Sequence, residues 1–255
     1  MSDHSVYLYA IGDAAVADSE VLMETAGVEA VPVRTLVEGS LAAVVASVDR
    51  DRFSEESIRA RLEDLEWLEK IARTHHEVVD RIARVYPIAP VRMATIYLDD
   101  AGVRQLLRER AAELAATLDR VRGRSEWGVK GYAAPAEASA AEPAASASDA
   151  PGTSYLMRRR TERDRVAHRR ERVAQAAEKL HQELAQLAAD TRVHPPQDPR
   201  LTGRREVMIL NAAYLVDEAG AALLAQRVDA AADDELRLEL TGPWAPYSFT
   251  SLGQS

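Results

Sequence analysis

Histidines beside acidic residues are the side chains of this sequence best suited to chemistry. His75, His76 and Glu77 are adjacent, and Asp80 follows within one helical turn. A metalloprotease requires H-E-x-x-H, in which two imidazoles one turn apart bind zinc and the carboxylate acts as a base. Here Asp80 stands where the second histidine would be, so a His/Asp metal pair is geometrically possible, but no third ligand is visible. We therefore prefer the interpretation that His75 or His76 caps or flanks a packed helix.

The rest of the sequence offers no catalytic constellation. His168, His181 and His194 are scattered over one expected helix and its exit, where solvated or packing roles are favoured. Nucleophile-elbow, P-loop and dinucleotide-binding motifs are missing from the sequence, and its serines have no base to pair with. The absence of cysteine excludes disulfides, thiol catalysis and thiolate-bound metals. We therefore expect a protein that is not an enzyme and that needs no cofactor.

A run of arginines is the strongest local charge. Three of them, Arg158, Arg159 and Arg160, stand near the start of an expected helix, and five more follow by position 172. Interspersed acidic residues favour a solvated helix face over a surface for RNA or for an acidic protein. However, positive charge at a helix start opposes the helix dipole, which indicates an acidic group that offsets it. These three arginines are therefore candidate protein-binding residues.

Aromatic residues gather near the C-terminus. Trp244, Tyr247 and Phe249 fall within six residues, and Pro243 and Pro246 stiffen the backbone around them. A rigid aromatic segment suits a protein contact, because little conformational entropy is lost on binding. Alternatively, the three aromatics seal the end of a second domain's core. The sequence leaves both interpretations open.

Composition describes a folded, acidic chain. Its 255 residues suffice for one large domain or two ordinary ones. The net charge of −9 disfavours nucleic acid as a partner. No apolar run approaches the length of a membrane span, and the N-terminus has no signal-peptide pattern, so we expect a cytoplasmic protein.

Hydrophobic periodicity and turn residues predict mixed helices and strands. In chain order, we expect a strand over 6–11, a hairpin of 34–37 and 41–48, a long amphipathic helix from 54 to 85, a strand over 91–98, a helix from 99 to 122, a strand over 126–132, a helix over 153–189, a strand over 207–216, a helix over 217–230 and a strand over 235–240.

Composition also predicts the domain boundaries. Residues 133–152 are almost entirely Ala, Pro, Ser, Glu and Asp, which is typical of a disordered linker. We expect an N-terminal ferredoxin-like α+β domain over 1–132 and a C-terminal α+β domain over 153–255, which holds the long helix and the aromatic tail. Similar segments, Tyr97–Leu107 and Tyr214–Leu224, favour two related halves with mostly antiparallel sheets. The predicted fold class is therefore α+β, with two ferredoxin-like halves, long amphipathic helices and an Ala/Pro-rich linker.

Several segments resemble the F/L family of gas vesicle assembly proteins. The stretch L-T-G-P-W-A-P-Y-S-F, Leu240–Phe249, is similar to that family's terminal signature L-T-G-P-W-P-P-Y-S-F. Weaker similarities follow the family's order at Val6–Tyr9, Pro90–Tyr97, Glu126–Lys130 and Leu210–Val216. This chain departs from the pattern at Met93–Ala94, where the family often has Phe-Gly, at Ala245, and in its Ala/Pro linker.

The resemblance implies an accessory role in assembly. Such proteins are minor components that contact the small, apolar shell-forming subunit of the gas vesicle, and they help nucleate vesicles without aggregation. It implies the major shell protein and other accessory proteins as partners, and neither nucleic acid nor a membrane. The alternative hypothesis is a ligand-sensing regulator or small-molecule enzyme on the same scaffold, because ferredoxin-like folds host many functions.

Overall fold

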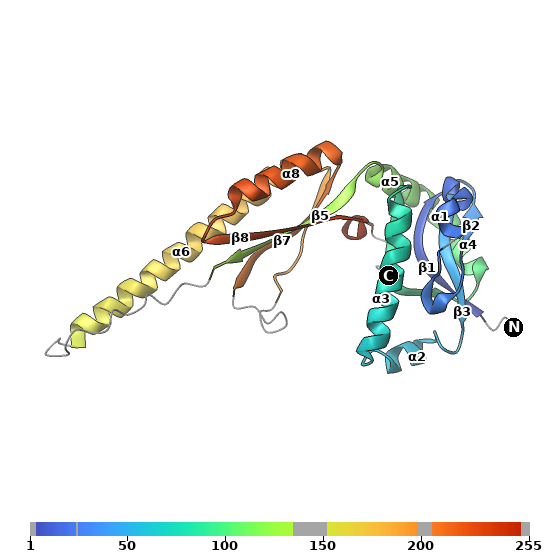
Figure 1. Cartoon of the computed structure of the whole chain (residues 1–255), viewed down its shortest axis with the longest axis horizontal. Helices are drawn as coiled ribbons and strands as arrows, with labels where there is room; N and C mark the ends of the chain where they lie inside the picture. The colour runs from blue at the N-terminus through green and yellow to red at the C-terminus, as the bar shows by residue number, and fades with distance from the viewer. Residues whose placement is uncertain (1–3, 24, 135–151, 198–205, 251–255) are drawn as a thin grey trace. The chain divides into compact units, whose positions relative to one another are not determined.

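The chain forms two compact units (Figure 1). The computed structural model describes residues 4–23, 25–134, 152–197 and 206–250. Unit 1 comprises Met1–Glu126 together with Pro243–Ser255, and unit 2 comprises Trp127–Gly242. This division differs from the domains expected over 1–132 and 153–255, because the strand near residue 130 joins the second sheet and the aromatic tail joins the first unit. Residues 135–151 of the expected linker lie outside the described residues.

Unit 1 is built on a four-stranded antiparallel sheet in the order β2-β3-β1-β4. Its strands are β1 (His4–Asp13), β2 (Val33–Glu38), β3 (Leu41–Asp49) and β4 (Ile88–Tyr97). The segments η1 (Ala14–Asp18), α1 (Glu20–Met23) and η2 (Val28–Ala30) connect β1 to β2. The predicted hairpin is confirmed: Glu38 pairs with Leu41, and Gly39 adopts a φ of 60° at the turn.

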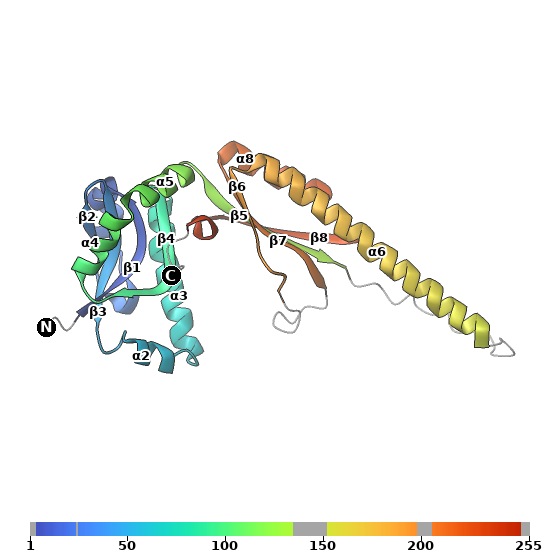
Figure 2. The ribbon, with the colours of Figure 1, turned by 180° about the vertical axis from the view of Figure 1, so that it is seen from behind.

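Two layers of helices enclose this sheet. Figures 1 and 2 show α3 (Leu65–Ala83) on one face and α4 (Asp100–Glu109) on the opposite face, and α5 (Ala111–Val121) packs on the same side as α4. Both faces of β1 are therefore buried, which explains its nearly continuous run of buried residues. Each face holds its own apolar cluster.

The long helix expected over 54–85 is in fact two helices, α2 (Glu55–Ala60) and α3. Ser54 caps α2, where its Oγ accepts from the Ser57 N–H at 3.2 Å. Asp64 caps α3, where its Oδ1 accepts from the Trp67 N–H at 3.0 Å. The second cap starts a new helix because its side chain competes with the backbone for helical hydrogen bonds.

Unit 2 repeats the same strand order, β6-β7-β5-β8. Its elements are β5 (Ser125–Ala133), α6 (Gly152–Leu187), β6 (Asp190–Val193), β7 (Val207–Val216), α8 (Glu218–Ala231) and β8 (Leu236–Trp244). Helices α6 and α8 pack beside each other and share one apolar cluster with the sheet (Figure 2). Both units therefore follow β-α-β-β-α-β order, which confirms the two-half α+β fold.

The repeated segments at Tyr97 and Tyr214 do not occupy equivalent places in the two halves. Tyr97 ends the fourth strand of unit 1, whereas Tyr214 lies in the third strand of unit 2. What the segments share is a helix start: Asp99 accepts from the Gly102 N–H at 2.9 Å, and Asp217 accepts from the Gly220 N–H at 2.8 Å. Their similarity therefore reflects the same capping chemistry.

Candidate protein-binding site

A buried polar chain crosses the core of unit 1. The side chains of Tyr7 and His75 lie in this core, where they are 0% and 3% exposed. Tyr7 Oη lies 3.1 Å from His75 Nδ1 and accepts from the Ala94 N–H at 3.0 Å. His75 Nε2 lies 3.2 Å from the Val91 carbonyl oxygen. Because that carbonyl can only accept, Nε2 carries the proton and Nδ1 accepts from the Tyr7 hydroxyl.

The hydrogen bonds of Tyr7 and His75 hold an irregular stretch of β4 in place. Leu8 pairs with Thr95, but Ala10 pairs with Pro90, so β4 contains extra residues opposite Tyr9. Ala94 lies in this stretch with a φ of 61°, in the left-handed region that favours glycine. Tyr7 and His75 bind the two ends of this stretch, at the Ala94 N–H and the Val91 carbonyl, and so replace the strand pairing lost there.

Burial sets the electrostatics of this core. It lowers the pKa of His75 to about 4, because a charged imidazole would lose its hydration there. Burial also raises the pKa of Tyr7 above its ordinary value and that of Tyr9 to about 12. All three side chains are therefore neutral at pH 7, and the hydrogen bonds of Tyr7 and His75 join β1, α3 and β4.

The aromatic tail docks on this core from outside. Phe249 is fully buried, and Ala245 belongs to the same apolar cluster as Tyr7. The Tyr247 ring lies 6.3 Å from that of His75, and burial raises the pKa of Tyr247 above its usual range. The three aromatics thus do not seal the second domain's core, which was the alternative expected from sequence.

Polar contacts fix the tail backbone in unit 1. The Glu126 carboxylate accepts from the Ser248 N–H at 2.8 Å and from the Ser248 hydroxyl at 2.6 Å. Arg120 donates to the Phe249 carbonyl, and the Thr250 hydroxyl donates to the Pro90 carbonyl at 2.8 Å. These contacts cover the tail from Ser248 to Thr250, so its geometry is determined by partners far away in the sequence.

Trp244 differs from the other tail aromatics because it is 43% exposed. Its ring packs against His76, with 5.5 Å between ring centroids. The tail therefore places two aromatics inward and presents one outward on a fixed backbone. Of the three aromatics predicted for protein binding, Trp244 is the most exposed and therefore the most available to a partner.

The arginines predicted for protein binding lie on α6 of unit 2. Arg159 and Arg160 are exposed, and the side chain of Arg158 lies outside the described residues. Further along α6, Arg169 and Arg172 form ion pairs with Glu235, at 3.3 and 3.2 Å. Glu235 therefore offsets arginines in the middle of α6, and an acidic group that offsets Arg158–Arg160 at its start stays a prediction.

The residues considered as a metal pair have other partners. His76 contacts Trp244, and Asp80 forms an ion pair with Arg84 at 2.6 Å. In the described part of the chain, no group of three or more His, Cys, Asp or Glu side chains is arranged to hold a metal ion. Nor does any helix in that part have the length and apolarity needed to cross a membrane.

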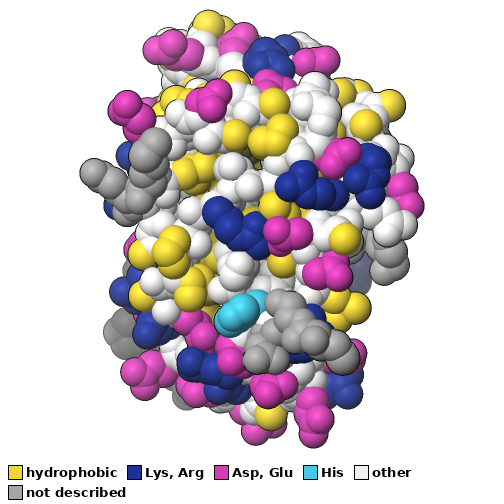
Figure 3. Space-filling view, turned by 90° about the vertical axis from the view of Figure 1, so that its right-hand side faces the viewer, with side chains coloured by type: hydrophobic (Ala, Val, Ile, Leu, Met, Phe, Trp, Pro, Cys, Tyr) yellow, Lys and Arg dark blue, Asp and Glu magenta, His cyan; other side chains and the backbone are white. Residues whose placement is uncertain are grey.

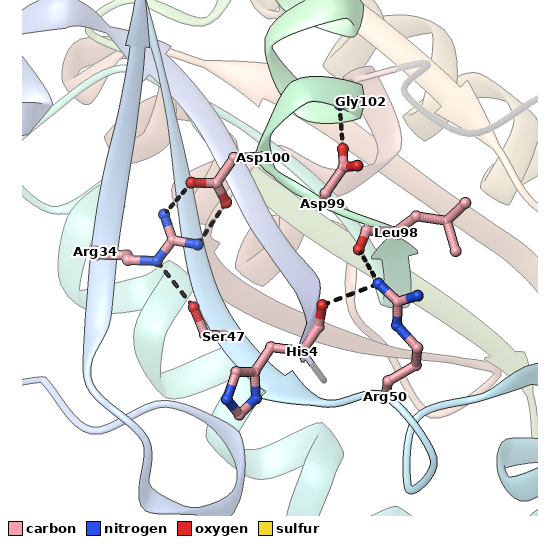
Figure 4. A network of polar contacts seen from close by, with 8 residues as sticks. All are labelled: His4, Arg34, Ser47, Arg50, Leu98, Asp99, Asp100 and Gly102. Carbon is pink, nitrogen blue, oxygen red and sulfur yellow. Dashed lines mark hydrogen bonds and ion pairs between the residues drawn. The ribbon is translucent and has the colours of Figure 1, made fainter. Parts of the chain in front are cut away.

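Two arginines join strands of the sheet to neighbouring segments (Figure 4). Arg34 of β2 binds the Asp100 carboxylate with two hydrogen bonds, at 2.6 and 3.0 Å, and donates to Ser47 at 3.1 Å. Arg50 donates from Nη2 to the carbonyl oxygens of His4 and Leu98, at 3.3 and 3.0 Å. Sequence analysis missed both, because the partners of each come from separate segments.

The fold and the fixed tail define a class of protein with two ferredoxin-like units. Solved structures share this fold over nearly the whole chain. The gas vesicle protein GvpF from an Anabaena species superposes with a TM-score of 0.65 at 20% identity, with 98% of each chain covered. GvpF from Microcystis aeruginosa gives 0.65 at 18% identity, over 97% of this chain and 99% of that one.

Sequence comparison identifies the family. A profile of the gas vesicle synthesis protein GvpL/GvpF family matches residues 5–251. Gas vesicle protein L of a Streptomyces species is 44% identical over 230 residues, which cover 89% of this chain and 86% of that protein. Gas vesicle protein L2 of Halobacterium salinarum is 25% identical over 95% of this chain and 90% of its own length. The chain belongs to the GvpL/GvpF family, and its role is in gas vesicle assembly.

Proposed function

We propose that this chain binds the apolar shell-forming subunit of the gas vesicle and helps to nucleate vesicles without aggregation. A subunit that builds a shell has to expose apolar surface, and such surface self-associates unless another protein covers it. A covering protein needs apolar contact groups on an otherwise charged exterior. Figure 3 supports the requirement for a charged exterior, because acidic and basic side chains are interspersed with hydrophobic ones on the face drawn.

The observation that carries this proposal is the exposure of Trp244 on a fixed tail. Tryptophan is among the residues that contribute most to binding at protein interfaces. The next residue, Ala245, is buried in the unit 1 core, and Glu126 binds Ser248 further along, so little entropy is lost when a partner covers the Trp244 ring. The arginines near the start of α6 provide a separate charged surface for an acidic part of a partner.

The test uses the full chain and the purified major shell protein. We expect the two to co-purify and Trp244→Ala to weaken binding by at least about tenfold, since such a loss corresponds to about 1.4 kcal/mol. The matched control is Leu223→Ala, which removes a 47% exposed apolar side chain from α8. Circular dichroism melting should be unchanged for both variants. Binding of Trp244→Ala at wild-type affinity would refute the role of the tail.

A further inference from the structure

The edge strand β4 is closed along its first half and open along its second. Residues Ile88–Val91 are buried, and Thr250 of the tail binds the Pro90 carbonyl beside them. From Arg92 onward the strand is exposed or half-buried. In the part of the chain that the structure describes, β4 pairs with β1 alone, so the outer backbone groups of residues 95–97 have no strand partner.

A groove runs beside this open half. Its volume is about 640 Å³, and apolar side chains line both of its walls. Phe53, Ile58 and Leu62 come from the α2 side, Ala94 and Ile96 from β4, and Leu98 from the residue that follows β4. Ile96, in the regular part of β4, packs against the apolar cluster that contains Phe53, so the groove lies on the α3 side of the sheet.

Two leucine side chains at the groove are exposed to solvent. Leu98 is 72% exposed and Leu62 is 55% exposed. An exposed apolar groove beside an unpaired strand edge is the arrangement to which extended peptides bind by adding a strand. A helix would fill the groove but would leave the edge backbone groups unpaired, so the open edge favours an extended occupant.

The charges at the groove indicate what such a segment carries. Arg59 is paired with Glu55 at 2.8 Å, so its charge is offset. Arg50 donates to two carbonyl oxygens, and no ion pair joins it to a carboxylate within the described residues. One positive charge at the groove is therefore left for an acidic residue of the occupant.

We propose that the open half of β4 binds an extended, apolar segment of the shell-forming subunit as a fifth strand of the unit 1 sheet. Apolar side chains of that segment fill the groove between Leu62 and Leu98, and an acidic residue at one end pairs with Arg50. The irregular stretch ending at Ala94 and the Arg50 contact to the Leu98 carbonyl limit the added pairing to residues 95–97. This proposal rests on the proposed function, because it names the surface that contacts the shell subunit.

The test measures binding of the purified major shell protein to the full chain and to two groove variants. Leu98→Ser and Leu62→Ser should each weaken binding by about tenfold, with unchanged melting because both side chains are exposed. Leu223→Ser on α8 is the matched control and should bind like the wild type. In the wild-type complex, hydrogen exchange of the outward-facing amides within residues 95–97 should slow by at least about tenfold, because strand addition pairs them.

The outcomes separate this inference from the proposed function. If the wild-type chain does not bind the shell protein, the proposed function fails. If binding occurs but both groove variants bind like the wild type, the groove is not the site. If the variants lose binding while the β4 amides stay unprotected, side chains dock without strand addition and the inference is wrong. If the free chain dimerises and Leu98→Ser makes it monomeric, the occupant is a second copy of the chain, which also overturns it.

Discussion

At the scale of single residues, Tyr7 and His75 hold a chain of hydrogen bonds inside an apolar core. Each buried polar atom that loses its partner costs about 1–3 kcal/mol. This series of hydrogen bonds therefore stabilises the fold, because every polar atom in it is paired. The chain starts at the Ala94 N–H and ends at the Val91 carbonyl, which are the two ends of the irregular stretch of β4. Removal of one member should therefore leave more than one group unpaired.

Tyr7→Phe tests this dependence. The change removes the hydroxyl that serves both Ala94 and His75, and we expect a loss of about 2–4 kcal/mol in the free energy of unfolding. Tyr9→Phe is the matched control, because its hydroxyl serves one partner, the Val28 N–H at 2.8 Å, and its loss should cost about 1–2 kcal/mol. Urea unfolding of both variants measures the difference. Equal losses of unfolding free energy in the two variants would show that the hydrogen bonds of Tyr7 do not depend on one another.

His75 makes stability depend on pH. Its pKa is about 4 in the folded chain against 6.5 for the free side chain, so between these values the unfolded chain binds more protons. Stability from this group is therefore fully present above pH 6.5 and is lost as the pH falls from 6.5 to 4, by about 3 kcal/mol in total. Urea titrations at several pH values should give a flatter dependence for His75→Gln, whose amide does not titrate. An equally steep dependence in that variant would assign the effect to other groups.

Ala94 carries strain that glycine would remove. An alanine in the left-handed region costs about 1–2 kcal/mol, whereas glycine costs about 0.4–1 kcal/mol through the unfolded state. We therefore expect Ala94→Gly to stabilise the chain by up to about 1 kcal/mol in urea unfolding. The control, Ala116→Gly on the exposed face of α5, should destabilise it by about 1 kcal/mol. Destabilisation by Ala94→Gly would mean that its methyl group packs favourably.

Sequence alone predicted part of the unit 1 core. The β-forming run that begins at Val6 identified the strand that carries Tyr7, and the helical pattern placed His75 on a packed helix. The hydrogen bonds between them could not be predicted, because they join residues 68 positions apart. The Met93–Ala94 departure from the family pattern was visible, but its backbone angle was not.

At the scale of elements, local signals determined what could be predicted. Strand β7 and the β2–β3 hairpin agree closely with their predicted ranges, because apolar runs and turn residues mark both ends. The break between α2 and α3 was missed because apolar residues keep helical spacing across Asp64. Strand β6 was missed because it has four residues and is defined by its pairing with β7.

The capping residue of α8 gives a prediction at this scale. Asp217→Ala leaves the Gly220 N–H without its acceptor, and we expect a loss of about 1 kcal/mol from unit 2. Asp234→Ala is the control, because it removes the same charge from an exposed position outside any helix start. Thermal melting of the two variants should differ by a few degrees. Equal melting temperatures would show that charge, not capping, decides the effect.

At the scale of the whole molecule, the two units have separate cores although the chain enters unit 1 twice. Phe249→Ala should therefore destabilise unit 1 by about 3–5 kcal/mol, because it empties a fully buried site. Leu184→Ala removes a fully buried side chain of unit 2 and should cost about 2–5 kcal/mol there.

Amide hydrogen exchange distinguishes the two effects. Phe249→Ala should speed exchange in β1 and leave β7 unchanged, and Leu184→Ala should do the reverse. Faster amide exchange in β7 of Phe249→Ala would contradict the assignment of the tail to unit 1. Sequence analysis could not make this assignment, because the tail follows unit 2 in the chain and its partners, such as Pro90, lie far upstream.

The return of the tail to unit 1 also sets an order of events on the ribosome. Translation produces residues 1–126 first, but the side chain of Phe249 and the hydroxyl of Thr250 are added only after all of residues 127–242. In the nascent chain, the site of unit 1 that Phe249 fills therefore stays empty while unit 2 is synthesised and becomes free to fold. The unit whose synthesis begins first is completed last.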